Sequence, residues 1–338
     1  MGIKLKSLAR RSLYETGALA AWHRWRRDDT LTVALFHRVL PDGDSRWRRT
    51  DPSITLSADG FRDGLSFLRR HYEIVALDDV LANRRQRRPL PPRALLITFD
   101  DGWADSLEVA APILEEFGLP AALFAASDAI QDQDSAWWQA GAAHLVRSGG
   151  APDRLIQAAQ DGDELAFLDR LYRMSVTERR QVLAAAMSPE RGRCGKREML
   201  SCQDLRSWRA RGFAVAAHGA AHMPLTALSE AEVKRDLEKS RGDLARLLGA
   251  DAAAPEAALA FPHGRYDDSV IQIARDSGFE VLFTSEPCVN ALDNEGRCSD
   301  LLGRIAIDAT AVGDAGGRLR PERLASWLFA RKSRRLDA

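Results

Sequence analysis

The sequence predicts an α/β fold, a (β/α) barrel of seven or eight strands interrupted by a helical insertion. Short apolar segments alternate with helix-length amphipathic segments along most of the 338 residues, which is the pattern of repeated βαβ units in a parallel sheet. The length suits one barrel-sized domain. Acidic and histidine side chains also follow several of the apolar segments, and the carboxyl ends of barrel strands share the mouth that holds the active site.

Composition narrows the class of partner and the compartment. Lys and Arg number 48 and Asp and Glu number 48, so the net charge is zero and no basic field indicates a nucleic-acid partner. Apolar runs fall well short of the roughly 20 residues of a membrane-spanning helix, and the N-terminus lacks the apolar core of a secretory signal. We therefore expect a cytoplasmic protein. Its four cysteines, which show neither zinc-knuckle spacing nor disulfide-scaffold density, are expected to be free thiols: Cys194, Cys202, Cys288 and Cys298.

Residues 1–30 form a basic N-terminal segment with helical spacing. Residues 1–27 carry seven Lys or Arg and one acid, Glu15. Two interpretations remain open: an amphipathic segment in peripheral contact with an anionic membrane surface, or a solvated helix packed on the barrel. The modest apolar face favours the second interpretation.

The first half of the barrel is organised around the segment ALLITF, residues 94–99. A continuous apolar run of this length, bounded by turn signals, is typical of a strand buried on both faces of a parallel sheet. A helix is expected to follow it and to end at Gly118, a common C-terminal stop. The remaining predictions for this half are strands at 31–39, 72–77 and 121–126 and helices at 57–71 and 104–117.

The second half resumes the alternation at Ser201. Ser229 and Glu232 have the spacing of a capping box, so a long helix is expected to begin there and to end at Gly249. Residues 311–338 form a C-terminal helical unit, because the basic end of 321–335 suits the dipole of a closing helix. The other predicted elements are helices at 201–212 and 269–277 and strands at 213–217, 258–261, 281–286 and 302–307.

Residues 127–200 break the alternation within a barrel that spans 31–310. This stretch is polar, rich in Ala and Arg, and helical in pattern, so we interpret it as an insertion. Trp137 and Trp138 near its start either stack on sugar rings at the barrel rim or anchor the inserted helices. Large aromatics mostly serve packing, which favours anchoring.

His218 and His222 are the first candidates for metal ligands. They are four residues apart, so on a helical turn both imidazoles project on the same side. Two imidazole nitrogens and one carboxylate oxygen make a three-ligand site with a position left open for water, as in catalytic zinc centres. The pair alone is a weak signal. A barrel strengthens it by gathering into one mouth the polar residues that lie at or just past predicted strand ends: His37, Asp100, Asp101, His218, His263 and Arg304.

Four segments together resemble the polysaccharide deacetylase family, also called the NodB-homology or carbohydrate esterase family 4 group. They are TFDDG at 98–102, the pair His218 and His222, AFPHGRYDD at 260–268 and VLFTSEP at 281–287. The resemblance covers most of residues 31–310. It implies a distorted (β/α) barrel and metal-dependent hydrolysis of N-acetyl groups on sugars.

The resemblance also implies a role for each residue. Asp101, His218 and His222 would hold a divalent metal, zinc in the first place, with cobalt, nickel and iron also compatible with mixed His and carboxylate ligands. Asp100 would be the general base. The assignment is physically consistent, because a metal lowers the pKa of its water from near 16 toward about 7 and an adjacent carboxylate can take the proton.

Two departures from the family pattern concern the catalytic machinery. Ala260 stands where many members have an arginine that orients the base, so Arg265 or Arg304 is expected to substitute. No histidine follows His263 to supply the usual late general acid. His263 or His37 must then protonate the leaving amine, and the position of His263 at the mouth favours it.

Three further residues complete the candidate site. Pro262, which precedes His263, and Trp103, which follows the two acids, are candidates for contact with substrate or for support of the catalytic groups. Gly219 replaces a common Ser or Thr and so removes a supporting hydroxyl without removing a ligand.

The leading hypothesis is a metal-dependent hydrolase that removes N-acetyl groups from an N-acetylhexosamine-containing polysaccharide, oligosaccharide or glycan precursor. One alternative keeps fold and metal but opens cyclic amides or acts on small N-acyl compounds. Another is a non-catalytic glycan-binding protein, motivated by the missing arginine and late histidine. Sequence gives no indication of the oligomeric state.

Overall fold

The structure is a computed structural model that describes most of the chain. The residues described are 10–26, 28–48, 50–86, 88–131, 164–175, 178, 181–182, 197–249, 254–314 and 317–336. Much of the predicted insertion, with Trp137, Trp138 and Cys194, lies outside them. Both interpretations of the tryptophan pair therefore stay predictions.

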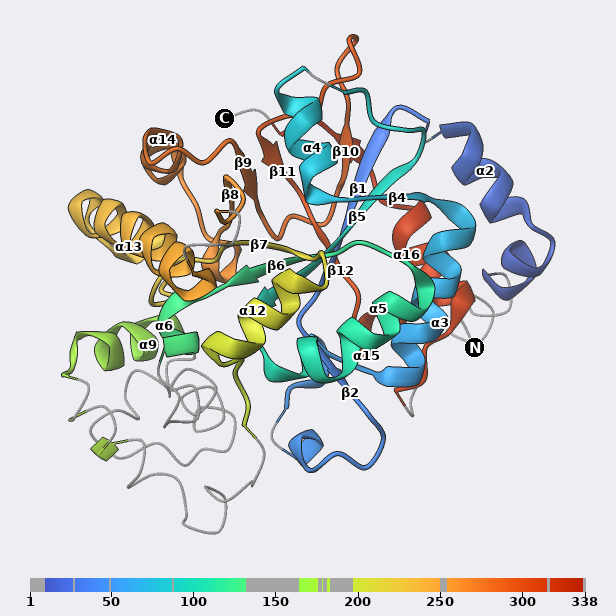
Figure 1. The fold of residues 1–338 in the computed structure, drawn as a ribbon. Coiled ribbons are helices and arrows are strands. Elements are labelled where there is room, and N and C mark those ends of the chain that lie inside the picture. Colours follow the sequence, from blue (N-terminus) through green and yellow to red (C-terminus); the bar gives the residue numbers. More distant parts are fainter. Residues whose placement is uncertain are drawn as a thin grey trace.

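A mixed, 11-stranded sheet, curled into a half-barrel, forms the centre of the molecule (Figure 1). Its strands pair in parallel except where β1 meets β10. Two strands lie off the main path: β12 (Ile305–Ala306) pairs with β1, and β4 (Glu73–Val75) pairs with β5. This confirms the predicted distorted (β/α) barrel. The main path runs β11 (Leu301–Leu302), β9 (Val281–Phe283), β8 (Ala258–Ala260), β7 (Ala214–Ala217), β6 (Ala122–Ala125), β5 (Ala94–Asp101), β1 (Thr30–Phe36), β10 (Val289–Ala291) and β13 (Ser333–Arg334).

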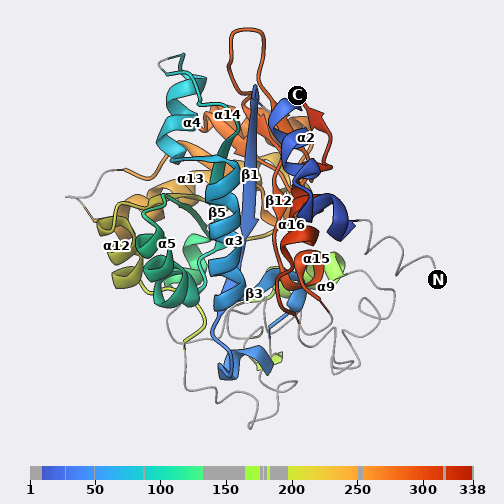
Figure 2. The ribbon, with the colours of Figure 1, turned by 90° about the vertical axis from the view of Figure 1, so that its right-hand side faces the viewer.

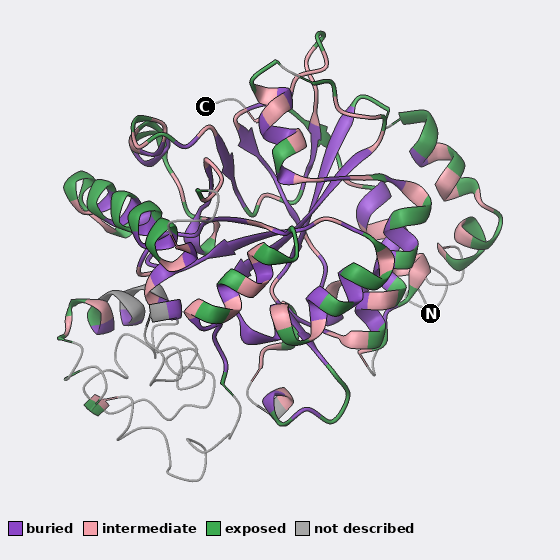
Figure 3. Cartoon of the chain, in the orientation of Figure 1, coloured by how far each residue is buried: buried purple, intermediate pink, exposed green. Residues whose placement is uncertain are grey.

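Helices surround this sheet, with their outer faces exposed, and most of the strands are buried (Figures 2 and 3). In α3 (Ala58–His71), the Ser57 side chain accepts the Gly60 N–H as an N-cap, and Phe61 and Leu65 face the core. A π-helical stretch, Ser106–Ala110, precedes α5. The other helices are α2 (Ala18–Arg26), α4 (Leu77–Arg84), α5 (Ala111–Phe117), α6 (Ser127–Gln131), α9 (Glu164–Arg173), α12 (Cys202–Ala210), α13 (Glu230–Leu248), α14 (Asp268–Asp276), α15 (Ala309–Val312) and α16 (Pro321–Phe329).

Strand β5 is the central element for the site. All eight of its residues are buried, and it pairs with β1 on one side and β6 on the other. The strand extends two residues beyond the predicted apolar run, so Asp100 and Asp101 belong to its end. A small parallel pair, β2 (Arg38–Leu40) with β3 (Thr55–Ser57), continues the chain beyond β1.

The C-terminal region is less helical than expected. Helix α16 ends at Phe329, and Ser333–Arg334 instead form β13, which pairs with β10. The predicted helix over 321–335 was therefore too long, because a basic end suits a helix but does not require one. Strands β10 and β13, of three and two residues, are too short to leave a periodic pattern in the sequence.

The N-terminal segment packs on the barrel through one face. His23 is buried, and its ring stacks on Phe329 with centroids 4.0 Å apart. Elsewhere in the segment, Trp25 is 83% exposed and Leu13 is 48% exposed. Peripheral membrane contact stays a prediction. Among the helices that the structure describes, none is long and apolar enough to cross a bilayer.

Candidate active site

Asp100 and Asp101 reach the site from the end of β5. Neighbouring strand residues ordinarily point to opposite faces, but Asp101 has a φ of 76°, which turns its side chain away from that alternation. As a result both carboxylates face one imidazole: His218 Nε2 lies 3.6 Å from Asp100 Oδ2 and 3.3 Å from Asp101 Oδ1. A non-glycine residue with positive φ is strained, and such strain tends to occur at functional positions.

His218 follows directly on β7, and its ring is fixed by the next strand. Its Nδ1 lies 2.8 Å from the carbonyl oxygen of Ala260, which can only accept a hydrogen bond. Nδ1 must therefore carry the proton of the neutral ring, and the lone pair of Nε2 is left to face Asp101. This arrangement is typical of metal-binding histidines.

The segment from His218 to His222 is a loop, which corrects the prediction of a helical turn. Gly219 has a φ of 68° and His222 a φ of 55°, neither of which a helix allows. Asp236 of α13 holds the loop, accepting the N–H of Ala220 at 2.8 Å and of Ala221 at 3.1 Å. Nothing in the sequence distinguished this acid from the charged residues around it on the helix.

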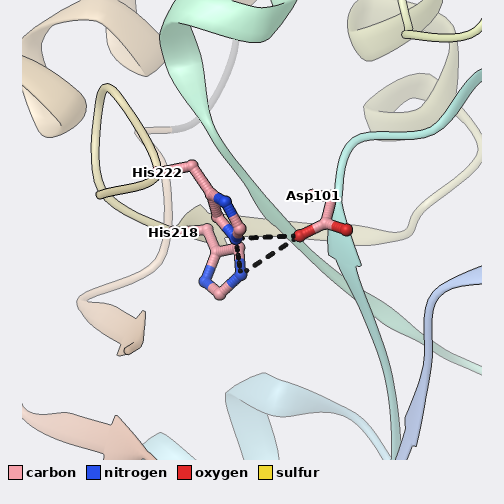
Figure 4. A group of neighbouring side chains, drawn as sticks. All are labelled: Asp101, His218 and His222. Atoms are coloured by element: carbon pink, nitrogen blue, oxygen red, sulfur yellow. Dashed lines mark hydrogen bonds and ion pairs between the residues drawn. The ribbon is translucent and has the colours of Figure 1, made fainter. Parts of the chain in front are cut away.

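Asp101, His218 and His222 point toward one another from β5 and from this loop (Figure 4). Asp101 Oδ1 lies 3.1 Å from His222 Nε2 and 3.3 Å from His218 Nε2, and the two nitrogens are 3.1 Å apart. Two ligands at right or tetrahedral angles around one ion, each bonded at about 2.1 Å, are separated by roughly 3.0–3.4 Å. The three buried atoms therefore fit a single divalent ion.

Asp100 is clamped by Arg304, which lies between β11 and β12. Nη1 donates to Oδ1 at 2.6 Å and Nη2 to Oδ2 at 2.7 Å, and Nε donates to the Thr284 carbonyl at 2.9 Å. Burial opposes ionisation of Asp100, but Arg304 and then His218 outweigh it, so the pKa of this carboxyl lies below its usual value. The pKa of Asp101 is also well below its usual range, because His222 and His218 outweigh the effect of burial.

The sequence had left Arg265 and Arg304 as equal candidates for the arginine beside the base. The structure places Arg304, which is fully buried, on Asp100, whereas Arg265 is exposed. Arg304 is 204 residues from Asp100 along the chain, so no sequence spacing could have selected it.

The two histidines considered as general acids have different surroundings. His263, which follows the buried Pro262, has a φ of 56°, and its Nε2 donates to the His222 carbonyl at 3.2 Å. The protein around its ring and the neighbouring His222 lower the pKa of His263, although the residue remains exposed to solvent. His37 lies between β1 and β2, near enough for its charge to lower the pKa of Asp100 and of Asp101.

Trp103 lies against the metal-ligand candidates. Its Nε1 donates to Asp101 Oδ2 at 2.8 Å, and the side chain is buried. Backbone bonds join this segment to the end of the predicted insertion, with Ala104 N donating to Glu198 O and Leu200 N to Gly102 O.

Comparison with solved structures shows the same fold at low sequence identity. A Streptococcus pyogenes deacetylase, PplD, in complex with acetate is 16% identical with a TM-score of 0.57, and covers 88% of this chain and 98% of its own. IcaB from Ammonifex degensii is 19% identical with a TM-score of 0.57, over 90% of this chain and 98% of its own. No curated protein sequence is similar enough to this chain to count as a match.

Family membership follows from the sequence itself. The pattern of the family described as polysaccharide deacetylase matches residues 87–167 and 180–282, together more than half of the chain. Both acids at the end of β5 and both ligand-candidate histidines fall within these ranges. The chain therefore belongs to the polysaccharide deacetylase family of hydrolases.

Proposed function

We propose that this protein is a metal-dependent de-N-acetylase acting on an N-acetylhexosamine-containing polysaccharide, oligosaccharide or glycan precursor. The observation that carries the proposal is the buried triangle of Asp101, His218 and His222 beside a second acid, Asp100, whose two oxygens Arg304 occupies. The family of the chain supports the same activity.

Asp101, His218 and His222 would hold the metal. Two neutral imidazoles and one carboxylate suit zinc, and also cobalt, nickel or iron. When bound, a divalent ion supplies Lewis-acid chemistry, acidifying water and polarising the acyl carbonyl. The bond from His218 Nδ1 to the Ala260 carbonyl keeps the free lone pair on the nitrogen that faces the other two candidate ligands.

Asp100 would be the general base. Arg304 keeps the carboxylate ionised and fixes its plane, since both guanidinium bonds must hold at once. An ionised carboxylate can take the proton of the water that attacks the acetyl carbonyl. The arginine that orients this base would thus reach it from the segment before β12, so the lack of an arginine at position 260 does not count against the proposal.

The leaving amine requires a proton. His263 Nε2 already donates to the His222 carbonyl at 3.2 Å, so this nitrogen is not free to protonate a leaving amine. We therefore assign this step to His37 ahead of His263, which reverses the preference drawn from the sequence.

Two substitutions with different expected effects test the proposal. Asp101→Asn should lose both the bound metal and acetate release from acetylated hexosamine oligomers. Asp100→Asn should keep the metal and lose only acetate release. Asp300→Asn, which removes the partly buried partner of Arg275, is the matched control and should retain both. Metal content is measured by elemental analysis and acetate by an enzymatic assay. Unchanged metal and unchanged turnover in Asp101→Asn would refute the assignment.

The same assay separates the alternatives. Release of a different carboxylate from a panel of small N-acyl compounds or cyclic amides would show that the substrate is a small amide rather than a glycan. Binding of glycan without any turnover would support a non-catalytic role.

A further inference from the structure

The two oxygens of Asp101 have different partners. Oδ1 lies 3.1 Å from His222 Nε2 and 3.3 Å from His218 Nε2. Oδ2 accepts a hydrogen bond of 2.8 Å from Trp103 Nε1. Because an indole N–H can only donate, this bond requires a lone pair on Oδ2 and competes with any cation for it.

The indole is itself fixed by a buried charge pair. The guanidinium of Arg38 lies over the Trp103 ring, 4.1 Å from its centroid. Arg38 donates through Nε at 3.1 Å and through Nη2 at 3.0 Å to Asp105 Oδ1, and the Val39 N–H donates to Asp105 Oδ2 at 2.8 Å. Both charged side chains are buried, so loss of either would deprive the other of its nearest charged partner, since Arg46 Nη1 lies farther from Asp105 Oδ1, at 3.9 Å.

Packing restrains the rest of the Trp103 side chain. The residue forms an isolated β-bridge with Met199, and its side chain packs in a small apolar cluster with Met199, Ala126 and Ala129. The partly buried Ile54, from the segment between β2 and β3, packs against the same cluster. A ring held by a cation on its face and by apolar contacts has little freedom to turn its N–H away from Asp101.

We propose that Trp103 is a positioning residue that reserves Oδ1 of Asp101 for the metal and keeps this carboxylate a single-oxygen ligand, with Arg38 and Asp105 holding the indole. The inference rests on the proposed function. A carboxylate is able to bind an ion through one oxygen or through two. Blocking the second oxygen preserves the open position that a catalytic site requires.

The test replaces the indole by a ring without the N–H. Trp103→Phe removes the donor and keeps an aromatic side chain. Trp327→Phe is the matched control, since Trp327 Nε1 also donates, to Ala306 O at 2.8 Å, and Arg331 also lies over its ring, 3.7 Å from the centroid. Zn²⁺ and Co²⁺ affinities are measured by calorimetric titration of metal-free protein, and the visible absorption of the Co²⁺ form is recorded.

Loss of the N–H should weaken metal binding by about 10- to 100-fold, the usual effect of removing a hydrogen bond to a ligand. The Co²⁺ absorption should also fall in intensity, because a carboxylate that binds through both oxygens raises the coordination number. Trp327→Phe should change neither. A spectral change of this kind would not arise from a merely structural role in which the fold loosens but the ligands stay the same.

Unchanged affinity and an unchanged spectrum in Trp103→Phe would overturn the inference while leaving the proposed function in place. Failure of the unsubstituted protein to bind either ion would instead remove the proposed function, and the inference with it. If Trp103→Phe does not fold, Arg38→Lys provides the second measurement: it keeps the charge beside Asp105 but removes the planar group from the indole face. The same spectral change with a smaller loss of affinity supports the inference, and no change overturns it.

Discussion

Substitution of Arg304 by methionine should destabilise the protein more than the loss of any exposed ion pair. The change keeps an unbranched apolar stem but removes three hydrogen bonds, two to Asp100 and one to the Thr284 carbonyl. It leaves Asp100 buried without the guanidinium that offsets its burial. Breaking a buried pair in this way costs about 3–5 kcal/mol. At roughly 2 °C per kcal/mol for a chain of this size, the melting temperature should fall by about 6–10 °C.

Arg275 offers a control of the same chemistry in a more exposed place. Its guanidinium also makes two bonds to one carboxylate, from Nε to Asp300 Oδ2 at 2.8 Å and from Nη2 to the same atom at 2.7 Å, but the arginine side chain is 32% exposed. Partly exposed pairs contribute about 0–1 kcal/mol, so Arg275→Met should have little effect.

The assay is denaturant unfolding in the presence of a chelator, so that metal binding does not enter the measured free energy. The series comprises Arg304→Met, Asp100→Asn, the double variant and Arg275→Met. Residues in direct contact are coupled by about 0.5–3 kcal/mol, and this buried pair should lie near the upper end, with the double variant less destabilised than the sum of the single variants. Additive effects, or equal losses for Arg304→Met and Arg275→Met, would refute the reasoning.

Two further predictions concern backbone shape and pH. Gly219→Ala should lower the free energy of unfolding by at least about 1 kcal/mol more than Gly118→Ala, measured by denaturant unfolding. Both glycines have positive φ, but a Cβ at 219 would lie 2.9 Å from Asp236 Oδ2, whereas the space beside Gly118 is open. Burial, and then Arg70 and Arg24, lower the pKa of His71 to about 4. As the pH drops below 6.5, His71 is therefore protonated in the unfolded chain but not in the folded one, and the free energy of unfolding decreases. When the pH is lowered from 7 to 5, the free energy of unfolding should decrease by about 1–2 kcal/mol less in His71→Phe than in the unsubstituted protein. Equal decreases in the two proteins would contradict this.

The strands that build the barrel could be predicted because a strand that is buried on both faces consists almost entirely of apolar residues. Strand β5 is apolar without interruption, as a strand covered on both faces must be, and the acids at its end mark the mouth. The loop from His218 to His222 could not be placed in the same way, since a spacing of four residues fits a helix and a loop equally well. The glycine at 219 was the available signal, because its φ of 68° suits glycine best.

The partners of the buried acids could not be predicted from the sequence for a different reason. Arg304 and Asp100 meet through the closure of the sheet, so their pairing depends on which strand ends adjoin. Asp236 and Asp105 resemble solvated acids of charged helices, yet both are buried and bonded to backbone N–H groups. Burial of a single polar residue does not change the periodic pattern of apolar residues from which burial is predicted.

The position of Arg304 has a consequence for how such proteins are recognised. Several strands of a curled parallel sheet end around one carboxylate, so a guanidinium can be supplied from any of them without altering what the carboxylate experiences. Here Ala260 ends β8 while the cation comes from the segment before β12. A search that demands the arginine at one place in the linear order would therefore miss that this chain also sets a guanidinium against the carboxylate of Asp100.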